Sequence, residues 1–369
     1  MFPLEGEPAP ERRNVPPLLF SVALACVAMA LFIGVGATTQ VLNVGFGLWF
    51  TEVFIFFAVP WVALRLTGRS PPRHTGLSYP GLAPLGFGFL LGTVNYFAWV
   101  VPLQFVSHLL APEWMKELFD AAQIFKNQTP LELLVIITGV GLAAPVCEEV
   151  FFRGTFQQGL MSRLPAPWAL VVTAAVFSAF HLDPVGFFAR FELGVLFGVL
   201  FWKSGSVWPG IAAHAANNLV STALYFALAG AGVEEEEPAP LAVATLALVG
   251  LSAMAAVVQV GRRWKAAWRV PTPAMDVPGQ LPLAKPLRLV VPWLAAAGVS
   301  LLLLFTVDWR GVQLNLWDVR HRLPPMKKDA TLEEKANRKA LDELRSKARR
   351  GEVSLEEYQR RRKALAEQL

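Results

Sequence analysis

The chain has 369 residues, of which 54% are hydrophobic and 17% are charged, and its formal net charge is +5. Because a soluble domain usually carries about 25% charged residues, this composition excludes an ordinary soluble protein, and the small, scattered positive charge argues against nucleic acid as a partner. The two cysteines, Cys26 and Cys147, lie in apolar stretches and provide neither a disulfide framework nor a cysteine-rich metal site.

The apolar residues form blocks of roughly 17–28 residues, and each block is long enough to cross a hydrocarbon core about 30 Å thick. We therefore predict an all-α, polytopic membrane helical bundle with about eight or nine transmembrane helices and a charged helical C-terminal tail. Only Asp183-Pro184 separates the fifth span from the sixth, so these two could instead form a partly buried hairpin. The predicted spans are residues 17–38, 44–66, 83–108, 131–158, 166–182, 184–203, 206–229, 239–260 and 288–306.

Composition along the chain divides it into regions. In the loop after the third span, Trp114, Leu118 and Phe125 recur with charges between them, which suits either a helix lying in the membrane interface or an ordinary amphipathic loop. The predicted regions are a polar N-terminal segment at 1–16, three spans at 17–110, the interfacial loop at 111–130, a core with the polar motifs at 131–230, the last spans at 231–310 and the tail at 311–369.

Lys and Arg residues in short loops predict how the chain is oriented in the membrane. Eight spans before residue 262 would place the basic loops on the same side as the N-terminus, whereas loops on the other side carry acidic residues such as the run Glu234–Glu237. We expect an integral multi-pass protein of a bacterial inner membrane with a cytoplasmic N-terminus; a ninth span would put the tail outside, and its side is left open. The basic residues are Arg12, Arg13, Arg65, Arg69, Arg73, Arg163, Lys203, Arg262, Arg263, Lys265 and Arg269.

From about Lys327 onward the tail is highly charged and rich in helix-favouring residues. Its apolar residues are spaced to line one side of each of two helices, with Gly351 between them. The stretch Leu344–Leu365 resembles the small C-terminal SHOCT-type helical module, and a solvated helical tail is the alternative. The residues of the two apolar faces are Leu332, Leu341 and Leu344, then Val353, Leu355, Tyr358 and Leu365.

Ionisable side chains at membrane depth cost about 2.5–3.5 kcal/mol each on insertion scales, so they require an explanation. Glu148, Glu149 and Arg153 lie together near the end of the fourth span. On a helix, Glu149 and Arg153 are i,i+4 neighbours in the favoured order and can pair, whereas Glu148 is rotated by about 100° from Glu149 and lacks that partner. Such a carboxylate in a dry setting can serve as a general base. A helix end at the interface with solvated charges is the alternative interpretation.

Two further polar motifs follow downstream. Phe177-x-x-x-His181 closes the fifth span, and His214-x-x-x-Asn218 lies in the seventh. His214 and Asn218 are i,i+4 neighbours on one helix face, and both can donate hydrogen bonds, as an oxyanion stabiliser must. Taken singly, each motif is more typical of a structural role, such as an interfacial histidine or hydrogen bonding between membrane helices.

The three motifs in this order, Glu-Glu-x-x-x-Arg, Phe-x-x-x-His and His-x-x-x-Asn, resemble the CPBP family of membrane proteins. This family, also called Abi, includes the type II CAAX prenyl endopeptidases. The resemblance covers about residues 130–225 and includes the connecting segments Phe191–Gly198 and Ser206–His214. It implies an intramembrane endopeptidase that hydrolyses a peptide bond of a membrane-associated substrate, CAAX-like substrates included.

By this resemblance, Glu148 and His181 activate the attacking water, while His214 and Asn218 stabilise the oxyanion. Zinc hydrolases usually present three protein ligands, commonly His and carboxylates. Glu148, His181 and His214 could make such a set and hold a divalent metal such as zinc. No His-Glu-x-x-His motif occurs in the sequence, and a metal-independent glutamate mechanism is equally consistent, so the cofactor is left open between none and a metal.

The remaining charged residues of the first motif, Glu149 and Arg153, fit a supporting ion pair. Helix geometry thus separates the two carboxylates, with Glu149 paired and Glu148 available as the base. Cys147 beside Glu148 suggests a thiol protease, but an apolar neighbourhood favours the unreactive thiol, so we interpret Cys147 as a packing residue.

Two other classes of protein fit the same residues. A non-catalytic scaffold or immunity protein would keep them as a structural polar network, and a proton-coupled transporter would use them as a proton relay. Inverted repeats would favour transport, and none is evident in the sequence. The expected partners are the lipid bilayer and a membrane-associated peptide or protein.

Overall fold

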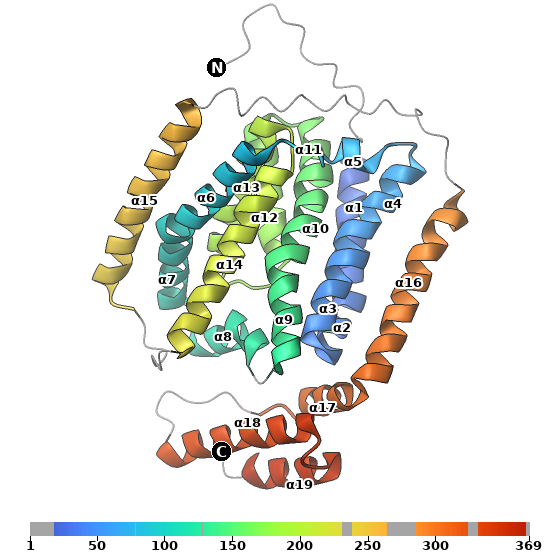
Figure 1. The fold of residues 1–369 in the computed structure, drawn as a ribbon, viewed down its shortest axis with the longest axis vertical. Helices are drawn as coiled ribbons and strands as arrows, with labels where there is room; N and C mark the ends of the chain where they lie inside the picture. The colour runs from blue at the N-terminus through green and yellow to red at the C-terminus, as the bar shows by residue number, and fades with distance from the viewer. Residues whose placement is uncertain are drawn as a thin grey trace, which may run out of the picture.

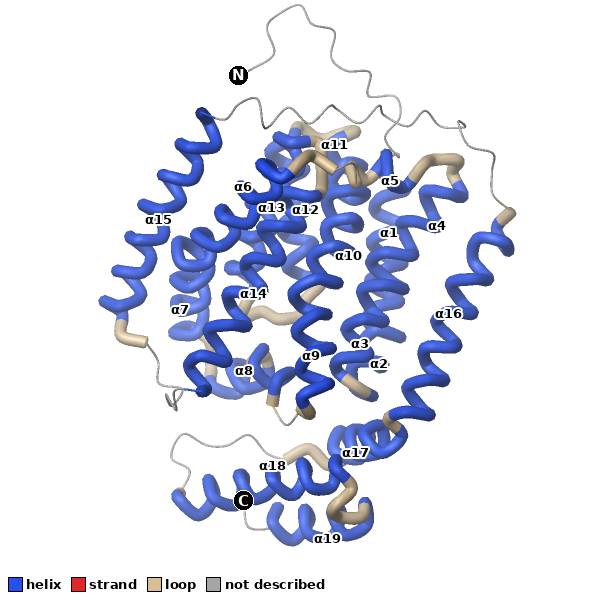
Figure 2. Tube along the Cα trace, in the orientation of Figure 1, coloured by secondary structure: helices blue, strands red, loops and turns tan. Residues whose placement is uncertain are grey.

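The structure is a computed structural model that describes residues 18–77, 79–126, 128–230, 238–263, 285–323 and 331–366. Within these ranges the chain forms helices, turns and loops but no strand (Figure 2), which confirms the predicted all-α polytopic class. The predicted N-terminal segment 1–16, the run Glu234–Glu237 and the basic residues Lys265 and Arg269 lie outside the described residues.

Six helical segments of the described chain are long and apolar enough to cross a membrane, namely Leu18–Leu42, Val44–Leu66, Leu82–Leu110, Pro130–Met161, Pro240–Arg262 and Pro286–Val307. The first four are divided by π-helical turns into shorter α-helical pieces (Figure 1). The pieces are α1 (Leu18–Leu31), α2 (Ala37–Leu42), α3 (Val44–Phe50), α4 (Ala58–Leu66), α6 (Leu82–Asn95), α7 (Val101–Leu110), α9 (Pro130–Thr138), α10 (Ala144–Phe151) and α11 (Gln158–Met161), and the last two segments are α15 (Pro240–Arg263) and α16 (Pro286–Val307).

Three further helices complete the membrane layer in Figure 1, namely α12 (Ala166–Ala179), α13 (Phe187–Ser204) and α14 (Trp208–Gly230). Helix α12 has 14 residues, about 21 Å at 1.5 Å per residue, which is shorter than a hydrocarbon core of about 30 Å. It packs against α13. The turn that joins these two helices therefore lies inside the layer, as the loop at mid-height in Figure 2 shows.

The π-helical turns are η2 (Phe32–Gly36), η3 (Thr51–Phe57), η4 (Tyr96–Val100), η6 (Gly139–Ala143) and η7 (Phe152–Gln157). Such turns are rare and often occur at functional sites. Two of them, η6 and η7, directly flank α10, the helix that carries the Glu-Glu motif. The irregular backbone of this segment thus surrounds the predicted site.

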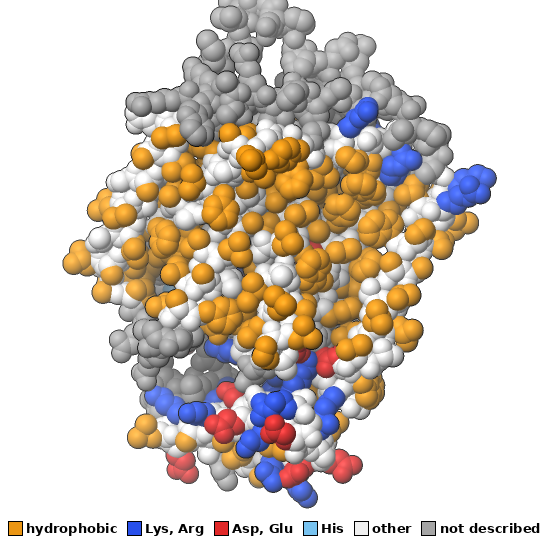
Figure 3. Space-filling model, viewed as in Figure 1, with side chains coloured by type: hydrophobic (Ala, Val, Ile, Leu, Met, Phe, Trp, Pro, Cys, Tyr) orange, Lys and Arg blue, Asp and Glu red, His pale blue; other side chains and the backbone are white. Residues whose placement is uncertain are grey.

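The main hydrophobic core lies between η3, α10 and α12 and is rich in aromatic rings. Phe56 contacts Phe151 and Phe180 at ring-centroid distances of 5.5 and 6.0 Å, and Phe152 contacts Phe177 at 5.2 Å. The face of the layer seen in Figure 3 is also largely hydrophobic, charged side chains of both signs gather at its lower end, and a few Lys and Arg side chains lie at its upper right. A hydrophobic exterior is what a lipid-facing surface requires.

Shorter elements lie at the ends of the layer. Helix α5 (Pro71–His74) lies at the upper end, and α8 (Glu113–Leu118) with the 3₁₀ turn η5 (Ala121–Phe125) lies in the predicted interfacial loop at the lower end (Figure 1). Trp114 and Leu118 are 57% and 56% exposed, as a helix lying in a membrane interface would need.

The tail forms α17 (Trp309–Arg320), α18 (Leu332–Arg350) and α19 (Leu355–Ala366) below the layer (Figure 1). Leu344 and Tyr358 are buried in one apolar cluster of the tail, and Leu341 is also buried. Leu332, the first residue of α18, is 87% exposed. Gly351, with φ of +86°, ends α18 in the left-handed conformation that glycine adopts without strain.

Candidate active site

Helix α9 begins with a capping box in which the Thr129 side chain accepts from the Glu132 backbone and the Glu132 carboxylate accepts from Thr129. Pro130 occupies the first helical position, where its missing N–H costs nothing. The chain then runs through η6 into α10, so the position of Glu148 in the membrane is set by a helix with a well-defined start.

Glu149 and Arg153 form an ion pair, with Arg153 Nη1 donating to Glu149 Oε1 at 2.7 Å. Both side chains are 0% exposed. Arg153 Nη2 also donates to the carbonyl of Gly194 at 3.0 Å, and the guanidinium lies 4.5 Å from the ring centre of Phe177. The pair therefore has the i,i+4 geometry that the sequence predicts, and α13 and α12 enclose it.

His214 lies between the two carboxylates. Its Nδ1 is 3.3 Å from Glu149 Oε1, and its Nε2 is 4.0 Å from Glu148 Oε2. The imidazole stacks on Phe197 with a centroid distance of 4.8 Å and an interplanar angle of 20°. The ring is thus fixed, with one nitrogen toward the buried ion pair and the other toward Glu148.

His181 follows the last turn of α12, inside the layer. Its Nδ1 is 3.0 Å from the carbonyl oxygen of Phe177. Because a carbonyl can only accept, this contact places the proton on Nδ1 and leaves Nε2 of the neutral ring as an acceptor. Leu182 has φ of +53°, and the chain turns away from α12 directly after the histidine.

Asn218 donates from Nδ2 to the carbonyl of Val140 at 2.8 Å, and its Oδ1 accepts from Asn217 Nδ2 at 3.2 Å. The backbone explains why this carbonyl is available. In η6 the N–H of Ala144 bonds to the carbonyl five residues earlier, but the next residue, Pro145, has no N–H for Val140. Asn218 supplies the donor that the proline lacks.

A cavity of about 450 Å³ opens among these helices. Glu148, His181, His214 and Asn218 all line it, whereas the lining does not include Glu149, Arg153 or Cys147. The structure thus brings the first four residues to one space and keeps the ion pair behind them. Cys147 is buried in the hydrophobic core, 5% exposed, as a packing residue would be.

The cavity also contains polar residues that the sequence motifs do not include. Among them are Glu52, Arg190 and Asn217. Glu52 on η3 is 4% exposed, and Asn217 is 6% exposed. Arg190 forms an ion pair with Asp183, which lies in the turn after α12. For Glu52 a signal was present, because an ionisable residue within a predicted span indicates function. Glu52 lies almost a hundred residues before the motifs in the sequence, so the sequence does not indicate that it lies near Glu148.

The proposed metal set does not assemble into a metal site. Glu148, His181 and His214 share the cavity, but within the described ranges no three His, Cys, Asp or Glu side chains lie close enough together to hold a metal ion. One of the nitrogens of His181 and one of His214 already face protein acceptors. We therefore derive no chemical step through a metal.

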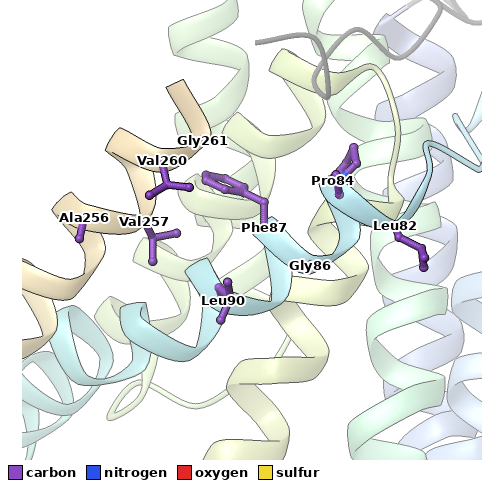
Figure 4. Close-up of a pocket in the computed structure, with 10 residues that line it drawn as sticks. Leu82, Pro84, Gly86, Phe87, Leu90, Ala256, Val257, Val260 and Gly261 are labelled. Carbon is purple, nitrogen blue, oxygen red and sulfur yellow. The ribbon is translucent and has the colours of Figure 1, made fainter. Parts of the chain in front are cut away.

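A second hollow, of about 580 Å³, lies between α6 and α15 (Figure 4). Its walls are apolar side chains and backbone and include Phe87, Leu90 and Val257. No side chain in this lining can donate or accept a proton, so of the two cavities only the first carries groups for acid–base chemistry.

Comparison with known proteins identifies the segment that carries the motifs. Residues 130–220 match the family model described as type II CAAX prenyl endopeptidase, Rce1-like. The match begins with α9 and ends within α14, so it includes the four cavity residues of the motifs. It confirms the resemblance to the CPBP family and supports an intramembrane protease of the CAAX type. No curated protein and no solved structure matches the chain.

Proposed function

We propose, on the premise that residues 130–220 form the protease segment of a CPBP-family membrane protein, that the chain is an intramembrane endopeptidase in which Glu148 and His181 activate water. The observation that carries this proposal is the separation of the two adjacent carboxylates. Glu149 is enclosed with Arg153, while Glu148 lines a cavity with two histidines and an asparagine. Ordinary solvated charges at a helix end would not be divided in this way.

In this mechanism a water in the cavity attacks the carbonyl carbon of the substrate peptide bond. Glu148 accepts a proton from that water. Nε2 of His181 is an acceptor in the tautomer that its Phe177 contact favours, so it can hold the other hydrogen of the water. The proton on Glu148 is then delivered to the amine nitrogen as the C–N bond breaks.

The negative charge that develops on the substrate oxygen needs donors that are already in position. Nδ2 of Asn218 has a second hydrogen besides the one donated to Val140. His214 in its doubly protonated form donates from Nδ1 to Glu149 and presents its Nε2–H to the cavity. The buried Glu149 carboxylate stabilises that charged ring, which gives the ion pair a supporting role.

The expected substrate is a membrane-associated peptide or protein. The cavity lies among helices with a hydrophobic exterior, and its lining extends to Ala121, Ile124 and Phe125 of η5. A CAAX-like peptide is the first substrate to test, because the matched family model is described as a type II CAAX prenyl endopeptidase.

The test uses the purified full-length chain in detergent or liposomes with a farnesylated CAAX-type peptide, and mass spectrometry of the products. We expect cleavage by the wild-type protein and a loss of about 10³-fold for Glu148→Gln and for His181→Ala, within the usual range for general acid–base groups. Cys147→Ala is the matched control and should keep its activity. Cleavage that persists in Glu148→Gln but is lost in Cys147→Ala would overturn the assignment.

Two additional measurements separate the alternatives. A glutamate-dependent mechanism predicts that chelators leave cleavage unchanged, whereas loss with a chelator and recovery with Zn²⁺ would assign Glu148, His181 and His214 to a metal. Proton-coupled uptake by proteoliposomes without any cleavage would instead support a transporter, and neither activity would support a scaffold.

A further inference from the structure

Glu52 is a second buried carboxylate at the candidate site. It lies on η3, is 4% exposed and lines the same cavity as Glu148. Its Oε2 is buried and accepts no hydrogen bond from any residue that the structure describes. A buried acceptor without a donor destabilises the fold, so Glu52 calls for an explanation other than stability.

The packing of two helices places Glu52 at the same depth as Glu148. The segment from α3 to α4 and the segment from α9 to α10 run in the same direction through the layer (Figure 1), and η3 packs against α10. Phe56 on η3 contacts Phe152 at 5.9 Å. Glu52 precedes Phe56 by four residues, as Glu148 precedes Phe152, so the two carboxylates lie about one turn from the same aromatic contact.

The two carboxylates also need the same partner. Oε2 of Glu148, like Oε2 of Glu52, is buried without a donor among the described residues, and the two groups interact electrostatically. A carboxylate can only accept hydrogen bonds, whereas a water molecule can donate two. A single water between them would satisfy both oxygens.

We propose that Glu52 is a positioning residue that holds the attacking water together with Glu148, an inference that rests on the proposed protease function. The water donates one hydrogen to Glu148 and shares the other between Glu52 and Nε2 of His181 as a three-centre hydrogen bond, which directs an oxygen lone pair toward the substrate carbonyl. Glu148 takes its proton as the O–C bond forms and returns it to the leaving amine as the C–N bond breaks. Glu52 keeps its hydrogen bond throughout and exchanges no proton.

The chain offers a matched control in Glu192. This carboxylate lies on α13 in the same layer and accepts from Asn95 Nδ2 at 2.8 Å, but the cavity lining does not include it. Glu192→Gln therefore removes a carboxylate at membrane depth without changing the cavity.

The kinetic test compares Glu52→Gln, Glu52→Asp and Glu192→Gln. For Glu52→Gln we expect kcat to fall by about 100-fold, the scale of a misplaced reactant, while KM changes less than about twofold because the water is not part of the substrate. Glu52→Asp keeps the carboxylate and should retain more activity than Glu52→Gln. A purely structural role predicts the reverse order, because glutamine preserves size better than aspartate does. The proposal would be overturned if Glu52→Gln kept the wild-type kcat, or if Glu52→Gln were more active than Glu52→Asp.

A stability cycle tests the pairing without any substrate. If Glu52 and Glu148 share a partner, the shifts in Tm of Glu52→Gln and Glu148→Gln should be non-additive in the double variant, while those of Glu192→Gln and Glu148→Gln should add. Additive shifts for the first pair would overturn the inference even in an active protease. Failure of the wild-type protein to cleave any peptide, with non-additive shifts, would instead count against the protease function and leave the carboxylate pair supported.

Discussion

Two arginine-centred networks in this molecule use the same chemistry in different surroundings. Arg153 pairs with Glu149 inside the layer, where both side chains are 0% exposed. Arg349 pairs with Glu132 and Asp308 at the junction between the layer and the tail, where its side chain is 10% exposed. The first network holds Glu149 away from the cavity, while the neighbouring Glu148 lines it. The second network uses both of its carboxylates, Glu132 and Asp308, to join helices.

The tail network explains how a charged module stays on a membrane bundle. Arg349 comes from α18, Asp308 caps the start of α17, and Glu132 belongs to the capping box of α9. Asn43 Nδ2 donates to Asp308 at 2.8 Å, which adds the turn between α2 and α3. Position in the layer thus decides whether an ion pair encloses a buried carboxylate or docks one region on another.

The largest effect is expected for Arg153→Met, which leaves Glu149 buried without its cation. Removing one partner of a buried pair typically costs about 3–5 kcal/mol, so we expect a large fall in Tm and in the yield of monodisperse protein. Arg349→Met is the matched variant and should lose less, because its carboxylates can still reach water. Equal losses for the two variants would show that burial does not distinguish the networks.

Asn218→Ala is expected to reduce kcat by about 100-fold, as removal of an oxyanion donor does, when cleavage of the CAAX-type peptide is measured. Asn315→Ala provides the matched comparison, since Asn315 Nδ2 donates to the carbonyl of Leu42 with the same 2.8 Å distance but at the tail junction. It should lose stability and keep its kcat. An equal loss of kcat in both variants would contradict a specific role for Asn218.

Much of this architecture could be predicted from the sequence, because apolar blocks and i,i+4 spacing are local properties. The i,i+4 spacing correctly predicted that Glu149 and Arg153 pair, and the predicted spans coincide with helices. The proximity of Glu52 to Glu148 could not be predicted, since it depends on how two helices pack. The same is true of Arg349 and Glu132, which are 217 residues apart.

A smaller effect is expected for Arg349→Met itself. Hydrogen bonds to charged groups contribute about 1.5–3 kcal/mol, so the tail should detach more readily without this side chain. Limited proteolysis between α16 and α18 should become faster, while cleavage of a substrate peptide keeps its rate. Proteolysis at the wild-type rate would mean that the apolar contacts of α17 suffice for docking.

The smallest effect is expected for Tyr358→Phe, within the tail. Burial, and then the negative charge of Asp318, raise the pKa of the Tyr358 hydroxyl, which donates to Asp318 at 2.6 Å. The folded tail therefore keeps a proton that the unfolded chain loses above a pH of about 10. The hydrogen bond from Tyr358 to Asp318 contributes about 1 kcal/mol to the free energy of unfolding. This contribution is complete below pH 10 and is lost as the pH rises further. Thermal unfolding of Tyr358→Phe should lack this alkaline decline; an unchanged decline would assign it to another group.

The π-helical turn η6 has a consequence for how the length of the chain can change. A π turn contains one residue more than the α turn it replaces. Removing that extra residue turns it into an α turn, and the helices on both sides keep their orientation relative to each other. Loss of one residue within Gly139–Ala143 would tighten this turn and leave Glu148 directed to the cavity. Loss of one residue within Ala144–Cys147 would rotate the following carboxylates by about 100° relative to the helix before them. Natural variation in length is therefore expected in η6 and not in the first turn of α10.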